Sequence, residues 1–212
     1  YLNSTLLISQ GKKWIDDKKL DEFKKVFSCR NSNDVIGEFF FLIASLYSSE
    51  EDYEKSNFYL NIAYHLNPKF KFNLSLLVEN HYINKNYVET LKTLKIFNKE
   101  NEFYYWFKTK KEALIISKQQ SDVASIDFIN SKFIKIKDPS IKIIFDIANF
   151  NKNVKKYKEA IRYYDQILSK KPIKSELYAE ILYRRGGSYE RIGQHLKSDE
   201  DLIKSLSIKP NS

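Results

Sequence analysis

One arrangement of small and large residues recurs along this chain with a period of about 34 residues. Within each period, large apolar residues stand three or four positions apart, which places them on one face of a helix. A turn then separates a first helix from a second. Small residues in both helices would allow close approach, and the large ones would fill the space around them. In the clearest copy, 179–212, the order is Leu182, Gly186, Tyr189, a turn at Gly193, Ser198, Leu202, Ser205 and Pro210.

The same arrangement fits upstream, in register. The stretch 105–140 has the right length but matches least well. We expect Trp106, Ala113 and Ile116 to line its first helix, and Val123, Phe128 and Phe133 to line its second. The predicted units are 4–36, 37–70, 71–104, 105–140 (divergent), 141–174 and 179–212.

This pattern resembles the tetratricopeptide repeat (TPR), a helix–turn–helix unit with a small residue in each helix and a closing proline. The last copy is most similar to the repeats of bacterial TPR proteins of poorly defined role. The resemblance implies an all-α fold, a right-handed superhelical α-solenoid of about six hairpins that forms one domain over 1–212.

Composition agrees with helices and excludes several alternatives. The chain has 5 Gly and 4 Pro among 212 residues, too few turn residues for a β-sandwich or barrel. Its single cysteine, Cys29, excludes an intrachain disulfide. No apolar run is long enough to span a membrane, and no targeting segment opens the sequence, so cytoplasm and periplasm both stay open. Because the sequence contains no Met, we expect it to be part of something longer.

No catalytic or metal-binding pattern stands out. The three histidines, His65, His81 and His195, have no Cys, His or carboxylate at metal-ligand spacing. The glycine pair Gly186–Gly187 lacks the Lys-Ser/Thr that a phosphate-binding loop requires. We therefore expect no enzyme activity, no cofactor and no metal.

The expected function is a protein-interaction scaffold or adaptor. The resemblance implies that the first helices line a concave groove, which binds a peptide or partner protein. An alternative is the binding of RNA or another polyanion by the basic second half, since 105–212 has 22 Lys and Arg against 13 Asp and Glu. We also expect further repeats, a partner or a second copy to cover the C-terminal end. The candidate groove residues are Phe41, Ser45, Tyr82, Lys142, Phe145, Asn149, Lys152, Tyr183, Arg184 and Arg191.

Overall fold

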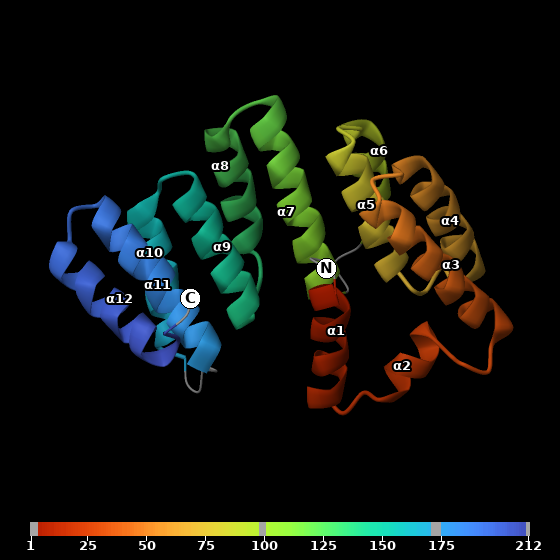
Figure 1. Ribbon diagram of the computed structural model, residues 1–212, viewed down its shortest axis with the longest axis horizontal. Coiled ribbons are helices and arrows are strands. Elements are labelled where there is room, and N and C mark those ends of the chain that lie inside the picture. The colour runs from red at the N-terminus through yellow and green to blue at the C-terminus, as the bar shows by residue number, and fades with distance from the viewer. Residues whose placement is uncertain (1–3, 98–100, 171–174, 211–212) are drawn as a thin grey trace. The chain divides into compact units, whose positions relative to one another are not determined.

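The computed structural model describes residues 4–97, 101–170 and 175–210. Within these ranges the chain folds into twelve helices and no strand, so the all-α prediction is confirmed (Figure 1). The helices are α1 (Ser4–Asp16), α2 (Asp21–Val26), α3 (Ser32–Ser49), α4 (Tyr53–Leu66), α5 (Phe72–Ile83), α6 (Tyr87–Leu94), α7 (Glu102–Gln119), α8 (Asp122–Phe133), α9 (Ile141–Asn153), α10 (Tyr157–Leu168), α11 (Ser175–Arg191) and α12 (His195–Ile208).

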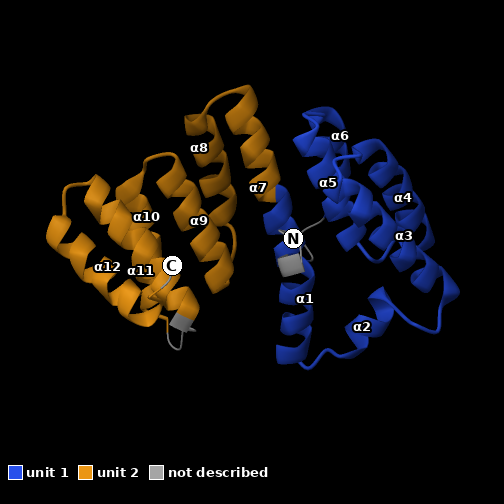
Figure 2. Cartoon of the chain, in the orientation of Figure 1, with its two compact units in different colours: residues 1–108 blue, residues 109–212 orange. Residues whose placement is uncertain are grey.

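The chain divides into two compact units, 1–108 and 109–212, with the boundary inside α7 (Figure 2). The prediction of one continuous domain with six repeat boundaries stays a prediction. In unit 1, α3 packs along α4, and α4 and α6 both pack against α5. Aromatic and aliphatic side chains fill its interior, including Leu60, Phe70, Leu74, Leu94 and Phe97.

Unit 2 consists of neighbouring hairpins in which α9 packs on α10, α10 on α11, and α11 on α12. Isoleucine dominates its interior. Four side chains at most 1% exposed represent this core: Ile129, Ile144, Ile147 and Ile167.

A pair of buried residues twelve positions apart, most of them small, recurs in five of the helical hairpins, one residue in each helix. In two of these pairs the hydroxyl of the second helix donates a hydrogen bond to the first: Ser56 Oγ donates to the Ala44 carbonyl oxygen at 2.8 Å, and Ser125 Oγ donates to that of Ala113 at 2.6 Å. The divergent hairpin α7–α8 thus has the same hydrogen bond between its helices as α3–α4. The pairs are Ala44 and Ser56, Val78 and Thr90, Ala113 and Ser125, Ala148 and Ala160, and Gly186 and Ser198.

Each of four turns places one residue at positive φ two positions before the second helix begins. These residues are Glu51 (φ 62°), Lys85 (φ 58°), Lys155 (φ 62°) and Gly193 (φ 75°). Only the last is a glycine, the residue that adopts this conformation at least cost.

In α8 the core-facing residues differ from those expected. Val123 is 64% exposed, whereas Ile126 and Ile129 are fully buried. The reason is the small pair: Ser125 faces Ala113, so the residues near Ser125 on the helix surface turn inward and Val123 turns out. The prediction for Phe133 holds, since it is 8% exposed.

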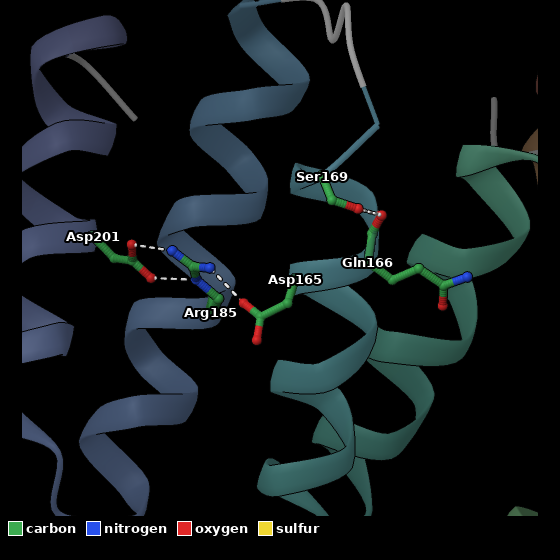
Figure 3. A network of polar contacts seen from close by, with 5 residues as sticks. All are labelled: Asp165, Gln166, Ser169, Arg185 and Asp201. Carbon is green, nitrogen blue, oxygen red and sulfur yellow. Dashed lines mark hydrogen bonds and ion pairs between the residues drawn. The ribbon is translucent and has the colours of Figure 1, made fainter.

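A partly buried ionic network joins α10, α11 and α12 (Figure 3). Arg185 donates to both carboxylate oxygens of Asp201, from Nε and Nη2, each at 2.7 Å. Its Nη1 donates to Asp165 Oδ1. Arg185 stands where the repeat pattern favours an apolar residue, and the two aspartates explain how this position accommodates a charge.

Candidate interaction face of unit 2

In unit 1, all three candidate groove side chains make contacts within the unit. The Phe41 ring lies 5.4 Å from that of Phe72 and 6.2 Å from that of Phe70, centroid to centroid. Ser45 Oγ donates to the Phe41 carbonyl oxygen at 2.8 Å. The Tyr82 ring lies 5.9 Å from that of Tyr87, and burial raises the pKa of Tyr82.

In unit 2, Phe145, Asn149 and Lys152 follow one another on one face of α9, four and three residues apart. Tyr164, fully buried on α10, donates its hydroxyl to Asn149 Oδ1 at 2.6 Å. Burial raises the pKa of Tyr164, so the phenol keeps its proton and acts as the donor. This bond uses the oxygen of the Asn149 amide and leaves the Nδ2 group to donate to a ligand.

Arg184 connects α11 to this face. Its guanidinium carbon lies 5.5 Å from the centroid of the Phe145 ring, a cation–π distance. Its Nε donates to Glu180 Oε1 at 2.6 Å, one helical turn earlier. The stacking and the ion pair together hold the Arg184 side chain beside α9.

The pKa of the Lys152 ammonium is lowered, first by partial burial and then by the positive charges of Arg184 and Arg191, while Glu180 opposes them. A lowered lysine pKa means that the surroundings disfavour its charge. An anion placed here would relieve this repulsion.

A hollow of about 500 Å³ lies at this position on the surface of unit 2. Gly187 leaves it open, because a Cβ added to this residue would meet no atom within 4 Å. Tyr183, with 57% of its surface exposed, supplies an aromatic wall. The lining residues are Lys152, Tyr183, Gly187, Glu190, Arg191 and Leu202.

The structure therefore brings together six of the candidate residues. Lys152, Tyr183 and Arg191 line the hollow, and the cation–π contact, the Tyr164 bond and the charge of Arg184 tie Phe145, Asn149 and Arg184 to the same face. Lys142 lies earlier on α9, outside the lining. Its pKa is lowered by burial, an effect that nearby Lys110 reinforces and Asp146 opposes.

Two side chains that contact this face, Tyr164 and Glu180, are not among the residues that the sequence indicates. Tyr164 is buried, and a buried tyrosine hydroxyl usually requires a hydrogen-bond partner, which here is Asn149. Glu180 precedes Arg184 by four residues, the spacing of an ion pair on a helix, and that signal was available.

Comparisons with known proteins identify the repeat. The family model for the tetratricopeptide repeat matches residues 179–212. The chain is a TPR-containing protein. No curated protein sequence matches it.

The TPR fold also appears in solved structures. The MamA protein is 15% identical, with a TM-score of 0.55 over 82% of this chain and 92% of that one. A Podosopora anserina structure described as kinesin light chain nearly identical TPR-like repeats is 14% identical, with a TM-score of 0.57 over 81% and 94%. The APC/C hetero-tetramer Cut9–Hcn1 is 10% identical, with a TM-score of 0.53 over 95% of this chain and 37% of that chain. At these identities the likeness shows the fold alone.

Neither a metal-binding cluster nor a membrane-spanning helix is found among the described residues. Across 4–97, 101–170 and 175–210, no three His, Cys, Asp or Glu side chains come together to hold a metal ion. None of the helices described is both long enough and apolar enough to pass through a membrane.

Proposed function

We propose that this TPR protein is a non-catalytic scaffold whose α9–α11 face binds an extended, acidic segment of a partner protein. The observation that carries the proposal is the group of three cations, Lys152, Arg184 and Arg191, beside the hollow. Arg184 has its own carboxylate, Glu180, but no ion pair involves Lys152 or Arg191 within the described ranges. A ligand carboxylate could bind between these two side chains.

The remaining groups suit a peptide in extended conformation. The Asn149 amide can donate to a backbone carbonyl oxygen, because its own oxygen already accepts from Tyr164. Tyr183 offers an exposed ring, and tyrosine and arginine are frequent energetic centres of protein interfaces. The face therefore combines a backbone donor, an aromatic contact and a charge-selective end.

The test is a binding titration of the full chain with a fluorescein-labelled decapeptide of Glu, Tyr and Gly, followed by anisotropy. The same peptide with Lys in place of Glu is the control ligand. We expect the Glu peptide to bind at least tenfold more tightly, and its affinity to fall as salt is added.

A matched pair of variants separates the face from the overall charge. Lys152→Gln with Arg191→Gln should weaken the Glu peptide at least tenfold, because hydrogen bonds to charged groups contribute about 1.5–3 kcal/mol each. Lys137→Gln with Lys158→Gln removes the same charge from exposed positions elsewhere in unit 2 and should change affinity less than twofold. Equal losses in the two variants, or tighter binding of single-stranded RNA than of peptide, would refute the proposal in favour of polyanion binding.

A further inference from the structure

A row of exposed apolar side chains lies along α3 in unit 1. Val35, Phe39, Leu42 and Leu46 are each between 45% and 66% exposed. Their spacing of four, three and four residues places them in one stripe, on the side of the helix opposite the buried Gly37 and Ala44. Such spacing is the form in which one helix packs on another.

The stripe continues onto α4 through a row of aromatic rings. The Phe39 ring lies 6.0 Å from that of Phe40, which is 5.8 Å from that of Tyr59. Tyr59 in turn lies 5.3 Å from Phe58, whose side chain is 61% exposed. We call the exposed set the α3 face, and its members are Val35, Ile36, Phe39, Leu42, Leu46 and Phe58.

Negative charge borders the α3 face along one side and at one end. The hairpin 32–66 contains six acidic residues and one lysine, a net charge of −5 in a chain whose net charge is +9. Asp34 and Glu38 follow one side of the stripe, and Glu50 and Glu51 stand just past its C-terminal end. The one lysine, Lys55, is already paired with Asp52 at 2.7 Å. The C-terminal end of a helix adds further negative potential here.

We propose that the α3 face binds an amphipathic helix of another protein, one whose apolar stripe is flanked by Lys or Arg. The negative charge beside the α3 face favours a basic helix over a second copy of the chain or a membrane. A second copy docked through α3 would bring acidic edges against acidic edges, which costs free energy, and an anionic membrane surface would be repelled for the same reason. The α3 face belongs to unit 1 and is independent of the peptide site proposed in unit 2.

The experiment uses the full chain and two synthetic helical peptides of 18 residues. Both have Leu at alternating spacings of three and four, and the remaining positions are Lys and Ala in one, Glu and Ala in the other. Because unit 2 is proposed to bind acidic peptides, both peptides are titrated into the full chain carrying Lys152→Gln and Arg191→Gln, which weakens that site. We expect the Lys peptide to bind this protein at least tenfold more tightly by isothermal titration calorimetry. Phe39→Gln with Leu42→Gln should reduce this binding at least tenfold and leave the melting temperature unchanged, because both side chains are exposed.

The matched control removes two exposed valines elsewhere, Val88→Gln with Val123→Gln, and should leave binding unchanged. Equal affinity for the two peptides would overturn the proposal, as would full binding of the Lys peptide by the Phe39 and Leu42 variant. A dimer in sedimentation that this variant abolishes would instead assign the face to a second copy. Binding to phosphatidylserine vesicles that the variant abolishes would assign it to a membrane.

Discussion

Replacing Arg185 tests how a charge is accommodated between three helices. Burial disfavours the guanidinium charge, but the hydrogen bonds and charges of Asp201 and Asp165 outweigh burial and raise the pKa of Arg185. The two carboxylates are not equivalent. The Asp201 side chain is 8% exposed, whereas that of Asp165 is 49% exposed and can be solvated by water if its partner is lost.

The magnitude follows from this difference. Arg185→Met leaves Asp201 buried and uncompensated, which should lower the free energy of unfolding by about 3–5 kcal/mol. Asp165→Asn removes only the half-exposed interaction and should cost about 1 kcal/mol or less. Adding Asp201→Leu to Arg185→Met should recover most of the loss, since the buried charge is then gone.

The assay is urea unfolding of the full chain, followed by circular dichroism, for the four proteins of the double-mutant cycle that joins Arg185 and Asp201. The coupling free energy between the two sites should exceed about 2 kcal/mol, because each single replacement leaves the other charge without its partner. The reasoning fails if Arg185→Met costs less than about 1 kcal/mol, or if the double variant loses the sum of the two single effects.

Two further predictions use pairs of residues as internal controls. Gly187→Ala should raise the free energy of unfolding by about 0.5–1 kcal/mol, because alanine is favoured over glycine in a helix. Gly186→Ala should give no such gain, because its Cβ would lie 3.1 Å from Leu202 Cγ. Equal gains for the two variants in urea unfolding would contradict this prediction. In an NMR titration, His81 should titrate below about 6.5 and His195 above it. Burial lowers the pKa of His81, and the hydrogen bond that the His195 ring donates to the Glu190 carboxylate raises the pKa of His195. Because the pKa of His81 is lowered, its contribution to stability is complete above about pH 6.5 and is lost as the pH falls. A His81→Gln variant that loses as much stability between pH 7 and 5 as the unmodified protein would contradict this assignment.

The sequence predicts the hairpins well because the small residues that form them can be recognised without coordinates. Spacing alone indicates Gly186 and Ser198 in the clearest copy, and both residues are buried in the structure. The error at Val123 arose because α8 offers two apolar sets at helical spacing. Only the contact of Ser125 with the preceding helix decides which set turns inward.

The candidate site was harder to predict, because its contacts join different helices. Lys152 and Arg191 were expected on the face from repeat register. The bond from Tyr164 to Asn149 and the stacking of Arg184 on Phe145 depend on how α9, α10 and α11 pack, and no local pattern encodes them. The pairing of Arg185 with Asp165 and Asp201 also depends on how neighbouring helices pack, so the sequence does not indicate it.

The central claim is that the face formed by α9 and α11 binds an acidic peptide, and photocrosslinking tests it most directly. The Glu peptide described above would carry a photoreactive benzophenone group at its centre, and the adducts on the full chain would be mapped by mass spectrometry. Adducts should concentrate in 141–153 and 175–191, with Tyr183 prominent because its ring is exposed beside the hollow. Adducts confined to α10 and α12, or spread in proportion to the lysines of the chain, would contradict it.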